Sequence, residues 1–76
     1  MAEFDAELDA RGLNCPLPIL RAKKSISGLE AGQVLKIAAT DSGAVKDFAA
    51  FCQQTGHELV RSQEEGGEFV FLIRKH

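Results

Sequence analysis

Residues 33–56, QVLKIAATDSGAVKDFAAFCQQTG, contain the two patterns that decide the fold. Residues 33–39 form a short apolar run bounded by glycine and by Asp-Ser-Gly, which is typical of a strand buried on much of its surface. Apolar side chains then recur with helical spacing over residues 44–55, and Gly56 follows as a helix stop. The apolar face of this predicted helix consists of Val45, Phe48, Ala49 and Cys52.

Further patterned segments lie on both sides of this strand and helix. Residues 4–9, FDAELD, alternate apolar and acidic side chains, which indicates a strand with one solvent-exposed face. Good helix formers from Ile19 to Ser27, followed by a glycine, predict a first helix. Two final strands are expected at residues 58–63 and 68–74, on either side of the hairpin signal Glu65-Gly66-Gly67. In the second of them Phe69, Phe71 and Ile73 alternate with Val70 and Leu72.

The predicted order of elements is βαβαββ, which favours one mixed four-stranded sheet with both helices on one face. This is an α/β (α+β) two-layer sandwich. The chain has 76 residues, of which 45% are hydrophobic and 26% charged, so we expect a single domain spanning residues 1–76. The glycines lie at element boundaries and form neither a GxxxxGK[ST] nor a GxGxxG phosphate-binding loop.

Composition also restricts the partners. The formal net charge of -2 argues against a protein that binds RNA or DNA mainly through phosphates, so we expect no direct binding to nucleic acid. The sequence has no signal peptide, and no apolar run approaches the roughly 18 residues of a membrane span. We therefore expect a cytoplasmic protein without membrane contact, monomeric when free, whose two cysteines remain thiols.

Cys15 is the leading candidate for chemistry. It lies between the first predicted strand and helix, immediately before Pro16, where a helix N-cap belongs. At that position the helix dipole and unpaired N–H groups, those of Leu17 and Ile19 being nearest, would favour the thiolate and lower the pKa of Cys15. Pro16 and Pro18 stiffen the loop. A rigid, exposed thiol can attack a partner's persulfide, store the outer sulfur and pass it on.

Other readings of the same residues stay open. A free cysteine is commonly a small buried side chain, and a structural Cys15 would fit a non-catalytic interaction or regulatory module. Cys52 continues an apolar helix face and is expected in the core, and the absence of a CxxC pattern argues against a dithiol pair or zinc site. His57 is expected to be structural and His76 to be frayed. We expect no metal and no cofactor.

The first predicted helix has two different faces. One face, expected to pack on the core, carries Ile19, Ala22 and Ile26. The other, a mixed patch of leucines and cations beside Cys15, carries Leu17, Leu20, Arg21 and Lys24. This patch suits docking of an acidic partner that brings its own reactive sulfur, and a merely solvated basic face is the alternative. Lys23 is expected at the edge of the core face, with its amine extended to water.

Three segments carry a resemblance to a known family: LDARGLNCPLPILRAKK at residues 8–24, KDFAAFCQQTGHELV at 46–60 and FLIRK at 71–75. They resemble the TusA (SirA-like) family of small sulfur-carrier proteins. The most specific element is the CPxP motif, here Cys15-Pro16-Leu17-Pro18, preceded by Asn14. The resemblance implies the same βαβαββ fold and gives Asn14, Pro16, Leu17 and Pro18 the role of positioning the reactive cysteine.

By that resemblance, Cys15 accepts sulfur as a persulfide from a cysteine desulfurase or rhodanese and relays it to acceptor proteins. The chain would then be a sulfurtransferase component with a covalent intermediate, not a stand-alone enzyme. The leading expectation for the pathway is synthesis of tRNA 2-thiouridine, and the alternatives are dissimilatory sulfur oxidation and sulfur supply for molybdenum cofactor. Some members of the tRNA branch carry an acid where this chain has Leu17, which leaves the acceptor open.

Overall fold

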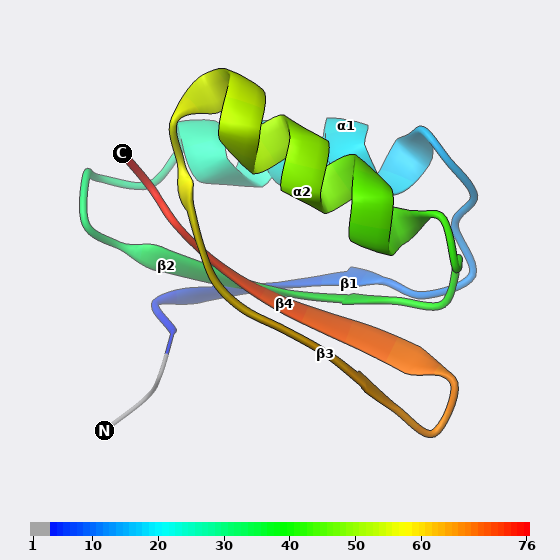
Figure 1. Ribbon diagram of the computed structural model, residues 1–76. Helices are drawn as coiled ribbons and strands as arrows, with labels where there is room; N and C mark the ends of the chain where they lie inside the picture. Colours follow the sequence, from blue (N-terminus) through cyan, green and yellow to red (C-terminus); the bar gives the residue numbers. More distant parts are fainter. Residues whose placement is uncertain (1–3) are drawn as a thin grey trace.

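The computed structural model describes residues 4–76 and has two helices lying over one face of a sheet (Figure 1). The elements, in chain order, are β1 (Ala6–Ala10), α1 (Leu17–Ser27), β2 (Val34–Ala39), α2 (Ala44–Thr55), β3 (Glu58–Glu65) and β4 (Glu68–Arg74). The βαβαββ order and the two-layer α/β (α+β) arrangement are confirmed. Within the described residues, neither helix has the length and apolarity needed to cross a membrane.

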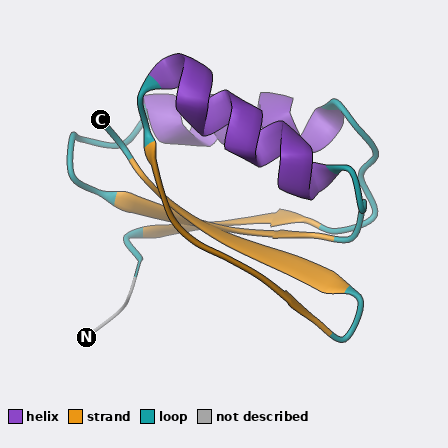
Figure 2. Cartoon of the chain, in the orientation of Figure 1, coloured by secondary structure: helices purple, strands orange, loops and turns teal. Residues whose placement is uncertain are grey.

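The four-stranded sheet is mixed and has the order β1-β2-β4-β3. β1 pairs parallel to β2, with Leu8 opposite Ile37, and β4 pairs antiparallel to both of its neighbours. Because β1 and β2 run in the same direction, they end at the same edge of the sheet. The loops that lead into α1 and α2 therefore lie together at one end of the molecule, as the teal segments in Figure 2 show.

The core lies between the helices and the covered face of the sheet. Every second residue of β2 is buried, which is the alternation expected of a strand with one covered face. Phe48 of α2 is fully buried, and its ring centroid lies 4.7 Å from that of Phe71 on β4. The buried cluster consists of Ala10, Ala22, Ile26, Leu35, Ile37, Ala39, Ala44, Phe48, Phe51, Cys52, Phe71 and Ile73.

The buried face of α2 differs from the predicted one. Phe48 and Cys52 are buried as expected, but Val45 is 40% exposed and Ala49 is also exposed. Ala44 and Phe51 take the buried positions instead. The large Phe51 ring packs edge-on against Phe48, with centroids 6.5 Å apart. Burying this ring removes more apolar surface from water than burying Val45 or Ala49 would.

Several predicted boundaries shift by one or two residues. β1 begins at Ala6 instead of Phe4, whose ring lies 5.1 Å from the Lys36 ammonium. β3 extends to Glu65, two residues beyond the expected end, because Gly66 and Gly67 adopt positive φ and close the hairpin with a two-residue turn. α1 begins at Leu17, not Ile19, and that shift changes the surroundings of Cys15.

Candidate functional site

Cys15 lies where the loops after β1 and β2 meet. The backbone N–H of Gly12 donates to the Thr40 hydroxyl oxygen at 2.9 Å, and the backbone N–H of Cys15 donates to Asp41 Oδ2 at 3.0 Å. The other oxygen of Asp41, Oδ1, accepts the Gly43 N–H at 3.3 Å. Asp41 thus ties the cysteine loop to the start of α2.

The CPxP segment forms a tight turn that leads directly into α1. The Leu17 N–H donates to the Asn14 carbonyl oxygen at 2.8 Å, and the peptide bond between Cys15 and Pro16 is cis. Pro16 occupies the N-cap position and Pro18 is buried in the first turn of the helix. Cys15 itself is exposed, which contradicts the alternative of a small buried side chain.

The N-cap prediction for Cys15 is therefore wrong by one residue. Cys15 precedes the N-cap Pro16, which has no N–H, and the Leu17 N–H is already bonded to the Asn14 carbonyl. The Leu17 N–H is therefore not free to stabilise a thiolate at Cys15, as the prediction required.

The pKa of Cys15 is raised above its ordinary value, opposite to the prediction. The main cause is a hydrogen bond with the Asp47 side chain, followed by partial desolvation and by the charges of Asp47 and Asp41. Negative charge beside a thiol disfavours the thiolate, so these neighbours favour the protonated thiol.

A cleft of about 320 Å³ runs between α1 and α2 and includes Cys15 in its lining. From α1 it is lined by Pro16, Ile19 and Lys23, and from α2 by Asp47, Ala50, Phe51, Gln54 and Thr55. The floor is mainly apolar, whereas Lys23 and Asp47 supply one charge of each sign. The cleft has the form of a groove in which a partner's chain can lie against the thiol.

The predicted docking patch lies on the exposed side of α1. Leu17 is 45% exposed and Leu20 is 54% exposed, and Arg21 and Lys24 are exposed as well. None of these four side chains lines the cleft. Ile19, predicted in the core, is half-buried, packs against the core cluster and also lines the cleft. The exposed Lys23 lines the cleft as well.

The second cysteine and the histidine behave as structural residues. Cys52 is a buried free thiol, and burial raises its pKa to about 11. His57 accepts the His76 N–H at Nδ1, across 3.0 Å, and its ring lies 5.7 Å from that of Phe51. His76 is held by this bond, contrary to the expectation that it is frayed. Among residues 4–76, no three His, Cys, Asp or Glu side chains are grouped to hold a metal ion.

Sequence reasoning missed the two acids beside the thiol. Asp41 follows β2 in the same way that Cys15 follows β1, and the ends of neighbouring parallel strands meet at one edge of a sheet. Once β1 and β2 are paired in parallel, this signal predicts that Asp41 lies near Cys15. The position of Asp47 requires the packing of α2 against α1, which the residue pattern does not show.

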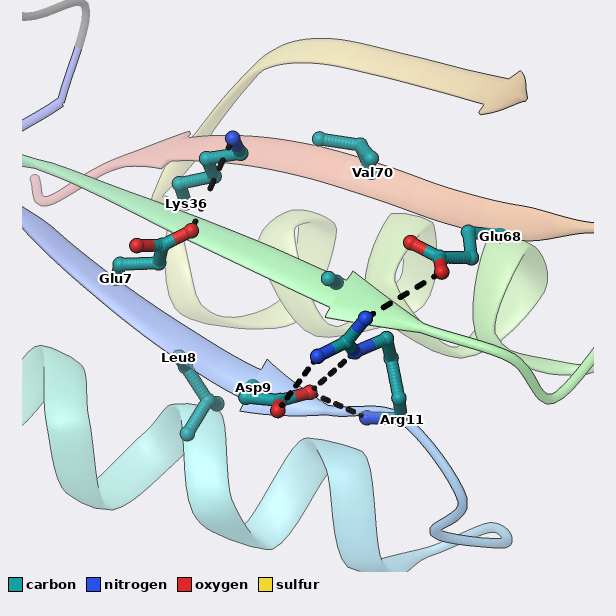
Figure 3. Close-up of a pocket in the computed structure, with 8 residues that line it drawn as sticks. Glu7, Leu8, Asp9, Arg11, Lys36, Glu68 and Val70 are labelled. Carbon is teal, nitrogen blue, oxygen red and sulfur yellow. Dashed lines mark hydrogen bonds and ion pairs between the residues drawn. The ribbon is translucent and has the colours of Figure 1, made fainter. Parts of the chain in front are cut away.

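A second hollow, of about 330 Å³, lies on the face of the sheet that the helices leave open (Figure 3). Its charged side chains pair with one another. Arg11 lies 2.9 Å from Asp9 and 3.5 Å from Glu68, and Lys36 lies 3.8 Å from Glu7. These exposed ion pairs contribute little to stability, and the hollow includes no thiol.

Fold and site together define a class of protein: a small two-layer α/β domain that presents one exposed thiol on a proline-framed turn. A sequence model described as "Sulfurtransferase TusA" matches residues 6–75. The chain belongs to the TusA family.

Individual relatives agree with this assignment. The chain is 67% identical over 75 residues to the sulfur carrier protein TusA of Allochromatium vinosum, with 99% of each chain covered. It is 52% identical over 67 residues to a putative sulfur carrier protein of Neisseria meningitidis, which covers 88% of this chain and 90% of that protein.

A solved structure shows the same fold. The crystal structure of a SirA-like protein from Desulfitobacterium hafniense matches with a TM-score of 0.82 at 25% identity, covering 92% of this chain and 96% of that chain. The resemblance to the TusA (SirA-like) family is thus confirmed by sequence and by structure.

Proposed function

We propose that the chain is a single-domain sulfur carrier, residues 1–76, whose reactive group is the thiol of Cys15. The observation that carries the proposal is the exposure of this thiol on the CPxP turn, in a chain of the TusA family. Asn14, Pro16, Leu17 and Pro18 form the turn that presents it.

Loading and release are two thiol exchanges. Cys15 attacks the outer sulfur of a donor persulfide, the donor's S–S bond breaks, and the donor leaves as a thiol. Cys15 then carries the persulfide until an acceptor thiol attacks its outer sulfur. No bound cofactor takes part, because each step exchanges one S–S bond for another.

The donor in this proposal is a cysteine desulfurase or a rhodanese, and the docking patch is formed by Leu17, Leu20, Arg21 and Lys24. These side chains are exposed on α1, which begins at Leu17, two residues after Cys15. Leucines contribute apolar contact area, and cations steer an acidic partner. The carrier would work as a free monomer in the cytoplasm, where thiols stay reduced.

Intact-mass measurement tests the reactive residue. The protein is incubated with a cysteine desulfurase and cysteine, with and without reductant, as the native chain and as Cys15→Ser and Cys52→Ser. A reductant-sensitive gain of ~32 Da, one sulfur atom, is expected in the native chain and in Cys52→Ser but not in Cys15→Ser. A gain that survives in Cys15→Ser contradicts the assignment, and no gain with either a desulfurase or a rhodanese supports a non-catalytic module.

The proposed pathway is relay to the synthesis of tRNA 2-thiouridine. The second candidate is sulfur oxidation, favoured by Leu17 at the motif position that is acidic in some members of the tRNA branch. Cells that lack their own carrier can be supplied with this chain or with Leu17→Glu, and tRNA 2-thiouridine measured. Restoration by the native chain is expected. Restoration by Leu17→Glu alone would favour the second candidate.

A further inference from the structure

The cleft between α1 and α2 places a carboxylate beside the reactive thiol. Cys15 and Asp47 line the same cleft, Cys15 from the loop before α1 and Asp47 from the first turn of α2. The Asp47 N–H donates to the Gly43 carbonyl oxygen at 3.1 Å, so the backbone that carries this carboxylate is fixed. The Asp47 side chain is also the largest cause of the raised pKa of this thiol.

Two other charged side chains face this thiol. Asp41 reaches Cys15 from the loop after β2, and Lys23 lines the cleft from α1. Both oxygens of Asp41 already accept backbone N–H groups, Oδ2 from Cys15 and Oδ1 from Gly43. Lys23 is a cation and has no lone pair to receive a proton at neutral pH. Of the groups around the thiol, the Asp47 carboxylate is therefore the one placed to accept its proton.

We propose that Asp47 is the general base that takes the proton of Cys15 as the thiol attacks a donor persulfide. This inference rests on the proposed sulfur-carrier function, and it gives the carrier a catalytic group of its own beside the sulfur that it loads. A docked donor covers the cleft and excludes water, which strengthens proton transfer between the two side chains.

The atoms balance without an added oxidant or reductant. The Cys15 S–H proton passes to a carboxylate oxygen of Asp47 while Cys15 Sγ forms a bond to the donor's outer sulfur. The donor's S–S bond breaks, and its electron pair leaves with the inner sulfur as a thiolate. Asp47 then returns the proton to that thiolate, so that one thiol and one persulfide give one persulfide and one thiol.

The obvious alternative is that Asp47 only suppresses the thiolate by its charge. The two roles predict different results for Asp47→Asn, which keeps the shape of the side chain and removes its charge and basicity. Under either role the variant forms thiolate at lower pH, because negative charge near the sulfur is lost. If Asp47 is the base, however, the protonated thiol also loses its assisted route, so the loading rate per thiolate falls.

The experiment measures loading and ionisation separately. The thiolate fraction is titrated by ultraviolet absorbance in the Cys52→Ser background, and single-turnover loading from glutathione persulfide is followed by intact mass from about pH 6 to 8. In the native site we expect a loading rate that changes little with pH. In Asp47→Asn we expect the rate to follow the thiolate fraction, and the rate divided by that fraction to fall about a hundredfold at pH 7.

Control variants and a folding check show whether the effect is specific to the Asp47 carboxylate. Glu30→Gln removes an exposed acid from the loop between α1 and β2, at the other end of the helices, and should leave the profile unchanged. Thermal unfolding of Asp47→Asn shows whether the fold is retained, and Asp47→Glu, which restores a carboxylate, should recover part of the pH-independent rate.

The outcomes separate the two proposals. If the rate per thiolate is the same in Asp47→Asn and in the native site, the general-base assignment is overturned while the carrier function stands. If the native chain takes no sulfur from glutathione persulfide, from a desulfurase or from a rhodanese, the carrier function and the role of Asp47 fall together.

Discussion

The backbone N–H of Cys15 donates a 3.0 Å hydrogen bond to Oδ2 of Asp41, a residue 26 positions further along the chain. This bond joins the two loops that follow the parallel strands, and it holds the reactive residue by its main chain, leaving the thiol accessible. Removing the acceptor should therefore loosen the loop and lower the stability of the fold.

We expect Asp41→Ala to lower the free energy of unfolding by about 1 kcal/mol, since two backbone N–H groups lose their side-chain acceptor. Urea unfolding monitored by circular dichroism measures the loss. Asp41→Asn keeps an acceptor oxygen and should retain more than half of that stability. An equal loss in both variants would assign the effect to charge instead of to the hydrogen bonds.

The raised pKa of Cys15 predicts slow alkylation at neutral pH. A higher pKa leaves a smaller thiolate fraction, and thiolate is the form that iodoacetamide alkylates. In the Cys52→Ser background, the native chain should react more slowly at pH 7 than the urea-unfolded chain, with the difference shrinking as pH rises above about 9. Faster reaction of the native chain would show that the acids do not control the thiol.

His57 should make stability depend on pH in mildly acidic solution. Desolvation, helped by the neighbouring His76 and Lys75, lowers the pKa of His57, and its Nδ1 must be unprotonated to accept the His76 N–H. The unfolded chain therefore binds a proton at His57 more readily than the folded chain does. The contribution of neutral His57 to stability is fully present above the pKa of His57 in the unfolded chain, and it is lost as pH falls through the lower pKa in the folded chain.

The measurement is the free energy of unfolding from about pH 7 to 5.5, a window above most carboxyl titrations. The native chain should lose stability toward the acidic end. His57→Gln should show a shallower slope, because the His57 imidazole is no longer there to bind a proton. Parallel slopes in the two proteins would place the pH dependence elsewhere.

The core depends strongly on Phe48. Its ring is fully buried and contacts the rings of Phe51 and Phe71. Phe48→Ala should cost about 3–5 kcal/mol, comparable to the whole stability of many domains of this size. Phe69→Ala, at a half-buried position, should cost clearly less in the same urea titration. Similar costs would mean that the core extends further along β4 than the burial indicates.

Adding a Cβ methyl group at Gly67, in the turn between β3 and β4, should lower the stability of the fold. Gly66 and Gly67 have φ values of +59° and +84°, and an added Cβ at either position would meet no atom within 4 Å. Gly67→Ala should thus cost about 1–2 kcal/mol through backbone conformation alone. Gly66→Asn is the control, since asparagine followed by glycine suits this turn and should be nearly neutral in thermal unfolding.

The order of elements was predictable because it rests on local patterns. The helical spacing before Gly56 and the alternation around Gly66 and Gly67 each report a period that the backbone imposes. The CPxP turn was predictable because its two prolines restrict the local backbone. Even the error in α2, where Phe51 and not Val45 faces the core, preserves the helical period and changes only its phase.

The electrostatics of the site were not predictable in this way. A cysteine before a helix suggests a lowered pKa, but the sign is decided by Asp41 and Asp47, which are distant from Cys15 in sequence. Their approach depends on the parallel pairing of β1 with β2 and on the packing of α2 beside α1. Such neighbours are a property of the tertiary structure, and a one-dimensional pattern does not encode them.

The place of β4 in the sheet has a consequence for how the chain folds during synthesis. β4 lies between β2 and β3 and supplies Phe71 and Ile73 to the core, although residues 68–74 leave the ribosome after every other element. Until they emerge, β1, α1, β2 and α2 lack the strand that pairs with the free edge of β2 and supplies Phe71 and Ile73 to the core. Closure of the core is therefore a late, non-local event, and the cysteine loop reaches its final geometry only after the last strand inserts.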